Sequence, residues 1–137
     1  MIISQNGLIT LEYDPATDIL SVSLPDIRKF TVSEVERSLA MVVEAVLSYD
    51  IKKILLDSSK SIVEVDDAEY RVVIMKFSGD LMKTRLKYLA RVGSPIAAQE
   101  KRASEVAQEV TRTQTLPVEF QNFMDRVEAH SWLVAKH

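Results

Sequence analysis

The sequence predicts an α/β fold in which a mixed sheet of four to five strands is covered by about four helices. Two observations indicate this class. Near the start of the chain, two segments with alternating apolar and polar residues flank a short turn, which is typical of an antiparallel hairpin. After them, short apolar runs alternate with longer segments of helical periodicity, which is typical of right-handed β-α-β crossovers between parallel strands.

The hairpin is predicted from residues 8–13 and 19–24, where apolar side chains recur at every second position. The residues between them begin with Asp14 and Pro15. Proline presets φ for a turn, and an aspartate side chain can accept hydrogen bonds from the turn's backbone. We therefore expect these two strands to be antiparallel neighbours.

Helices and strands then alternate to the end of the chain. Thr31 and Glu34 have the spacing of a capping box, and a helix with apolar residues three or four apart follows to about residue 46. The apolar run in residues 53–57 is predicted as a buried parallel strand. The later elements are expected as a helix over 66–83, a strand over 86–92, a helix over 95–112, a short strand over 117–120 and a closing helix from about residue 122.

The helix over 95–112 is expected to begin with Ser94 as its N-cap and Pro95 at its first position. It is rich in Ala, Glu and Gln and carries few large apolar residues, so it should lie mostly exposed.

Composition narrows the function classes. The length of 137 residues suits a single domain over 1–137, and 47% hydrophobic residues suffice for a core. The chain has no cysteine and only two histidines, His130 and His137, so we expect no metal site and no cofactor. A net charge of -3 argues against nucleic acid as a partner. No apolar run is long enough for membrane insertion, no signal peptide is seen, and the expected location is cytoplasmic.

Three segments resemble the STAS domain, and in particular its SpoIIAA-like branch of small stand-alone proteins. Residues 53–57 (Lys-Ile-Leu-Leu-Asp) are similar to the strand of that family that ends in Asp. Residues 88–93 (Tyr-Leu-Ala-Arg-Val-Gly) are similar to a later strand that ends in Val-Gly, and residues 128–133 (Glu-Ala-His-Ser-Trp-Leu) to the terminal helix. The resemblance covers about residues 8–134 and implies regulation through protein–protein contacts without catalysis.

The family also implies a phosphorylated serine at the start of the helix after the Asp-ending strand. In this sequence that place is occupied by residues 65–68, which read Val-Asp-Asp-Ala. Asp66 and Asp67 would supply a fixed negative charge where relatives carry a phosphate. Alternatively, they are an ordinary N-cap and a favourable anion at the positive end of the helix.

Asp57, Ser58 and Ser59 lie at the carboxyl end of the predicted central strand, the edge where open α/β sheets bind ligands. Either serine could contact a ligand or accept a phosphate, or could satisfy backbone groups of the loop. No histidine is placed to activate a serine and no G-x-S-x-G motif occurs, so no catalytic residue is assigned and the chain is not expected to be an enzyme.

The helix over 66–83 has two apolar stripes on nearly opposite faces, although a helix on a sheet needs only one. The second stripe is a candidate partner or homodimer interface, unless the neighbouring first helix or the terminal helix covers it; it comprises Tyr70, Ile74, Phe77 and Leu81. The first function hypothesis is therefore a regulatory module that binds a protein partner or forms a homodimer. The alternative is a small-molecule or lipid-binding domain with a pocket at the sheet's carboxyl edge, near Asp57 and Ser58.

Overall fold

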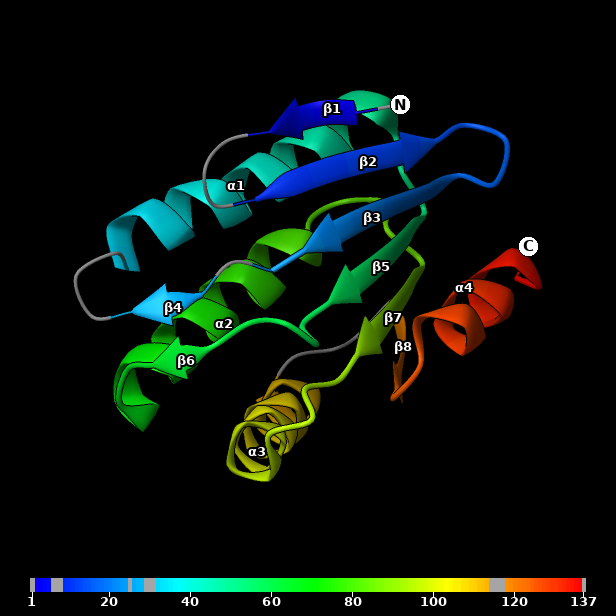
Figure 1. Cartoon of the computed structure of the whole chain (residues 1–137). Coiled ribbons are helices and arrows are strands. Elements are labelled where there is room, and N and C mark those ends of the chain that lie inside the picture. Colours follow the sequence, from blue (N-terminus) through cyan, green and yellow to red (C-terminus); the bar gives the residue numbers. More distant parts are fainter. Residues whose placement is uncertain (1, 6–8, 25, 29–31, 114–117, 137) are drawn as a thin grey trace.

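The computed structural model describes residues 2–5, 9–24, 26–28, 32–113 and 118–136, and it confirms the mixed α/β fold class (Figure 1). The described part holds a six-stranded sheet, a pair of two-residue strands and four helices. In chain order these are β1 (Ile2–Gln5), β2 (Thr10–Asp14), β3 (Ile19–Ser23), β4 (Ile27–Arg28), α1 (Val32–Tyr49), β5 (Lys53–Asp57), β6 (Val63–Glu64), α2 (Asp67–Leu81), β7 (Tyr88–Val92), α3 (Ala97–Thr113), β8 (Glu119–Phe123) and α4 (Arg126–Val134).

The main sheet has the strand order β1-β2-β3-β5-β7-β8. The predicted hairpin is present as antiparallel β2 and β3, with Leu11 opposite Val22. From β3 onward all neighbours are parallel, as the crossover pattern predicts. The carboxyl ends of β3, β5, β7 and β8 therefore lie along one edge of the sheet.

Three strands were not expected from the sequence. β1 adds an antiparallel edge strand to β2, which makes the sheet one strand wider than predicted. β4 and β6 form a separate parallel pair of two residues each, which is too short for any periodicity to reveal. Three predicted elements or their caps begin at residues outside the described ranges, namely Leu8, Thr31 and Pro117.

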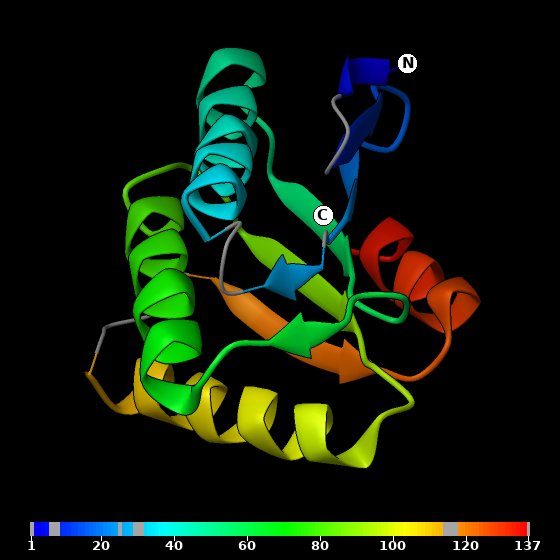
Figure 2. The same ribbon diagram turned by 60° about the vertical axis from the view of Figure 1, so that its left-hand side comes forward.

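The sheet separates two packed layers (Figure 2). α1, α2 and α3 cover one face, and their apolar side chains form the larger core with alternate residues of the strands, among them Leu20, Ile54 and Leu89. α4 lies on the opposite face, where Ala129 and Leu133 pack on Leu55 and Ala90. Because successive strand residues point to opposite faces, β3, β5 and β7 each contribute to both layers.

The helix after β7 differs from its predicted form. α3 begins at Ala97, two residues later than expected, so Pro95 does not occupy its first position. Ser94 still turns the chain, because its Oγ accepts a hydrogen bond from the Ile96 amide at 3.1 Å. α3 is also less exposed than expected, since it buries Ala103, Val106 and Val110 along one face.

The closing elements also shift along the chain. β8 begins at Glu119 and runs to Phe123, three residues beyond the predicted strand end. α4 therefore begins at Arg126, and its N-cap Asp125 accepts a hydrogen bond from the Val127 amide at 2.9 Å. Most side chains of β8 are exposed, so alternating burial did not mark where the strand ends.

Candidate functional site

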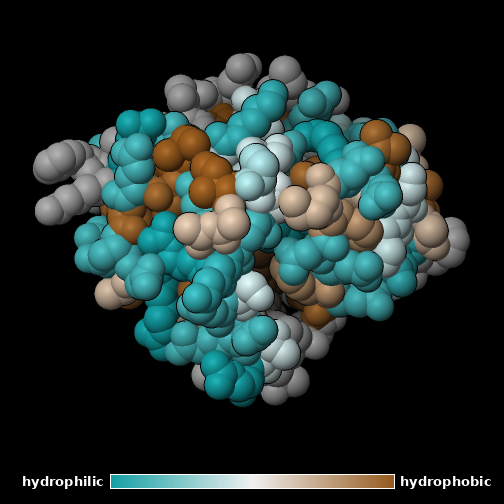
Figure 3. All heavy atoms as spheres, turned by 60° about the horizontal axis from the view of Figure 1, so that its bottom comes forward, coloured by the Kyte–Doolittle hydropathy of each residue, from teal (hydrophilic) through white to brown (hydrophobic). Residues whose placement is uncertain are grey.

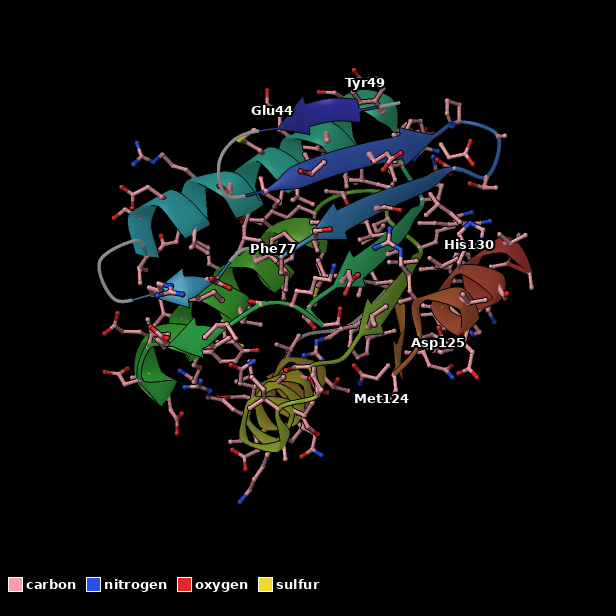
Figure 4. All side chains as sticks on the ribbon, in the orientation of Figure 1. Glu44, Tyr49, Phe77, Met124, Asp125 and His130 are labelled. Carbon is pink, nitrogen blue, oxygen red and sulfur yellow. The ribbon has the colours of Figure 1, made fainter. Side chains whose placement is uncertain are left out.

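A cavity of about 150 Å³ lies between the helix-covered face of the sheet and α2 and α3. Leu56 of β5 and Leu89 of β7 line it from the sheet, and α2 contributes the residues Tyr70, Ile74, Phe77 and Leu81. Figure 4 shows Phe77 between α2 and the sheet. The lining is predominantly apolar, so the cavity suits a nonpolar guest better than water.

Small residues on α3 explain why this space is left open. Ala103 and Ala107 line the cavity from α3, one helical turn apart. Each contributes only a methyl group at a position where a larger side chain would reach towards the sheet. The alanine-rich composition of α3 led us to expect an exposed helix. Instead α3 packs against the rest of the fold, and its small side chains leave the cavity between this helix and the sheet.

One end of the cavity is polar and coincides with the carboxyl ends of β5 and β7. Ser58 is buried there, and its Oγ donates a hydrogen bond to the Val92 carbonyl at 2.6 Å. Gln99 of α3 connects three segments: its Nε2 donates to the Ser61 carbonyl at 3.0 Å and to Ser94 Oγ at 3.2 Å, and its Oε1 accepts from the Val63 amide at 2.9 Å. This network fixes α3 against the loop that follows β5.

Arg91 is the charged residue of the lining, and Glu100 neutralises it. Two hydrogen bonds of 2.7 and 3.0 Å join the Arg91 guanidinium to the Glu100 carboxylate, which also accepts from the Ser94 amide at 2.7 Å. Burial by itself would raise the pKa of Glu100, but these hydrogen bonds hold that pKa below its ordinary value. A Cβ on Gly93 would lie 2.7 Å from Glu100 Oε2, so glycine permits the close approach.

Tyr70 brings a further polar group to the cavity lining. Its side chain is almost fully buried, with 8% of the residue exposed, and the Arg102 guanidinium lies 5.1 Å from the centre of its ring. Burial raises the pKa of Tyr70, so its hydroxyl is protonated at neutral pH. Among the described residues no group forms a hydrogen bond with that hydroxyl.

The structure separates the three polar residues that were singled out at the carboxyl end of β5. Ser58 lines the cavity, whereas Asp57 points to the opposite face and joins Arg126 of α4 at 2.9 Å. Asp57 also accepts hydrogen bonds from the amide and Oγ of Ser59, at 3.0 and 2.6 Å. Burial raises the pKa of Asp57, but these donors together bring it below its ordinary value. Asp57 and Ser59 thus order the loop and the contact with α4.

The two aspartates of the phosphosite-equivalent loop lie at the exposed start of α2. Asp66 is the N-cap, and its carboxylate accepts a hydrogen bond from the Glu69 amide at 2.8 Å. Asp67 lies 3.2 Å from the guanidinium of Arg102 and is 88% exposed. Asp66 is therefore an N-cap, which is one of the two interpretations that the sequence allows.

The second stripe of α2 is covered by other parts of the chain. Tyr70, Phe77 and Leu81 are buried and Ile74 is partly buried, and all four line the cavity. The stripe is thus covered within the chain, as the alternative expected, but mainly by the sheet and α3. Of the two helices named in that alternative, α1 lies beside Phe77, whereas the terminal helix α4 lies on the opposite face of the sheet. The exposed apolar residue of α2 is instead Val72, at 59% exposure.

The positions of Arg91, Gln99 and Glu100 at or beside the cavity were not predicted from the sequence. A signal existed for Arg91, because it follows Leu89 at the strand period and must share its buried face. Glu100 and Gln99 look like ordinary polar residues of an exposed helix. Only the position of α3 against β7 brings them to the cavity.

The described residues contain no cluster of three or more His, Cys, Asp or Glu side chains that could hold a metal ion. Within the same ranges, every helix is too short or too polar to cross a membrane.

The fold is similar to that of a solved structure from Shewanella loihica PV-4, an uncharacterised protein of the DUF3478 family with a SpoIIAA-like fold. The two chains are 20% identical, the alignment covers 96% of this chain and 98% of the other, and the TM-score is 0.58. No protein-family model and no curated protein matches the sequence. The resemblance to the SpoIIAA-like fold is therefore confirmed at the level of the fold.

Proposed function

We propose that this chain is a non-catalytic binding module that holds a small, mostly apolar molecule in the cavity between the sheet, α2 and α3. The main support for this function is the cavity itself, which has a volume of about 150 Å³ and an apolar lining. Enclosed apolar cavities of about this volume take up benzene or xenon. This cavity is partly open to solvent, since Thr111 and Phe120 of its lining are exposed, which gives a guest a way in. The volume favours a guest of roughly one aromatic ring over a long acyl chain.

The position of the cavity also supports binding. Its polar end lies at the carboxyl ends of β5 and β7, the edge of a parallel sheet where ligands commonly bind. The serines and Gln99 at that end are engaged in structural hydrogen bonds, and none is arranged with a general base. We propose a module without catalytic activity because these polar side chains already form structural hydrogen bonds and the sequence has no nucleophile motif. The absence of cysteine favours a cytoplasmic location.

Toluene is a suitable first probe because it is apolar and close to the cavity in size. We expect wild-type protein to bind toluene in a calorimetric titration, with methyl NMR shifts confined to cavity residues. Ala103→Leu places three additional carbon atoms in the cavity and should weaken binding at least about tenfold. Ala107→Leu is a second blocking variant at the same helix face.

The matched control is Ala98→Leu, the same substitution on the exposed side of α3. It should bind toluene as the wild type does. If neither toluene nor xenon binds to wild-type protein, the proposed function is wrong. Equal toluene affinity in the wild type and in folded Ala103→Leu and Ala107→Leu variants would likewise overturn it.

A second candidate function is a contact with a protein partner or a second copy of the chain. It is favoured by Met124 and Val127, which are 70% and 71% exposed where β8 meets α4. β8 pairs only with β7 among the described strands, so its other edge is available for a further strand. In the space-filling view, hydrophobic groups form separate patches on a largely hydrophilic face (Figure 3).

Light scattering after size exclusion tests this candidate. If copies associate through this surface, Val127→Glu should convert a wild-type dimer into a monomer. Val72→Glu, at an exposed valine of α2, is the matched control and should leave the dimer intact. A wild-type monomer at all concentrations would exclude the homodimer.

A further inference from the structure

The Tyr70 hydroxyl is the feature of the cavity that its apolar lining does not explain. It is buried, protonated at neutral pH and without a hydrogen-bond partner among the described residues. A buried hydroxyl that forms no hydrogen bond destabilises the fold relative to one that does. A ligand with one hydrogen-bonding group would supply the missing partner.

The charges near Tyr70 are already balanced by protein groups. Arg91 is paired with Glu100 through two hydrogen bonds. Arg102 donates to the Val65 carbonyl at 2.7 Å and lies 3.2 Å from Asp67. An anionic ligand would have to displace Glu100 from Arg91 or lie beside its carboxylate. A ligand with a neutral polar group can bind without displacing Glu100 and without being repelled by its carboxylate.

The shape of the lining favours a flat guest. Tyr70, Phe77 and Phe120 bring aromatic rings to the cavity from α2 and β8. Aromatic rings in edge or offset contact gain attraction beyond that from burial alone. Together with a volume suited to about one ring, this points to an aromatic compound.

We propose that the cavity selects a small, neutral aromatic compound with one hydroxyl group, which pairs with the Tyr70 hydroxyl. This inference rests on the proposed function and names the ligand class of the same site. Tyr70 would act as the specificity-determining residue, whereas the apolar lining would supply most of the affinity.

Phenol and toluene test the inference because they have nearly the same size and differ by a hydroxyl in place of a methyl group. In wild-type protein both should bind in calorimetric titrations. Tyr70→Phe removes only the hydroxyl, and it should weaken phenol binding about fivefold to tenfold while changing toluene binding less than about twofold. Tyr49→Phe is the matched control at a half-exposed tyrosine that does not line the cavity, and it should change neither affinity.

Benzoate tests the requirement for a neutral ligand and should bind at least about tenfold more weakly than phenol. If toluene binds but Tyr70→Phe leaves the ratio of the two affinities unchanged, the role of Tyr70 is wrong and the proposed function survives. Benzoate binding as tight as that of phenol would overturn the neutral-ligand claim alone. If no probe binds, the proposed function itself fails.

Discussion

Arg91 of β7 and Glu100 of α3 join the sheet to the helix that closes the cavity. Their side chains are only 14% and 27% exposed, and two hydrogen bonds of 2.7 and 3.0 Å connect them. The same carboxylate caps the Ser94 amide in the loop between the two elements. Together with the hydrogen bonds of Gln99, this ion pair holds α3 in place, and it balances the charge at the polar end of the cavity and orders the connecting loop.

Glu100→Gln should destabilise the protein because it leaves the poorly exposed Arg91 without a compensating charge. Removing one partner of a fully buried pair costs 3–5 kcal/mol, and the partial exposure here reduces the expected loss of unfolding free energy to about 2 kcal/mol. Glu109→Gln is a matched control, because Glu109 also pairs with an arginine, Arg71, but at the surface. Urea denaturation should show a clearly smaller loss for the control, and equal losses would contradict this account.

Stability should fall in acid because Glu100 and Asp57 both have a lowered pKa in the folded protein. The folded state then binds fewer protons than the unfolded state, so this stabilisation is present above the unfolded pKa, which is 4.5 for Glu100. It is lost as the pH falls through the lower folded value. We expect the unfolding free energy to decline from about pH 5 to about pH 3.

The same titration in the Glu100→Gln variant isolates the contribution of that residue. Because the variant lacks the titrating carboxylate, its unfolding free energy should depend less steeply on pH over this range. Parallel curves for the two proteins would show that Glu100 does not carry the effect.

The parts of the fold that the sequence predicts are those with strong local patterns. The strand over 53–57 is correct to the residue, because its apolar run is too short for a helix and follows directly after one. The Asp66 cap of α2 is also correct. β4 and β6 could not be predicted, since each has two residues and forms only when segments distant in sequence meet.

The candidate site was only partly predictable for a related reason. Ser58 was singled out by its place after a buried strand, and it does line the cavity. Two apolar stripes on α2 were visible, but which surface would cover the second one depended on where α3 packs. Because α3 looks polar in sequence, neither its packing nor the void left by Ala103 and Ala107 could be read from local patterns.

Asp66→Ala should lower the unfolding free energy by about 1 kcal/mol, because the Glu69 amide loses its hydrogen-bond acceptor. Asp66→Ser keeps an acceptor at the N-cap and should remain close to wild type. Thermal and chemical denaturation of both variants tests this role. If the serine variant is destabilised as much as the alanine variant, the negative charge and not the cap is the stabilising feature.

Leu133→Ala should cost about 3 kcal/mol, because Leu133 is fully buried between α4 and the sheet. Val134→Ala is the neighbouring control at a residue that is 43% exposed, and it should change stability by less than about 0.5 kcal/mol. Comparable losses in the two variants would mean that α4 does not pack through Leu133.

Crystals of the wild-type protein under xenon pressure show whether the cavity admits an apolar guest, because xenon enters cavities that are apolar and large enough. We expect an anomalous xenon peak inside the cavity, bordered by Phe77 of α2, Leu89 of β7 and Ala103 of α3. The peak should be missing in crystals of Ala103→Leu. If the wild-type cavity is filled by side chains or ordered water and excludes xenon, the proposed binding of an apolar molecule is wrong.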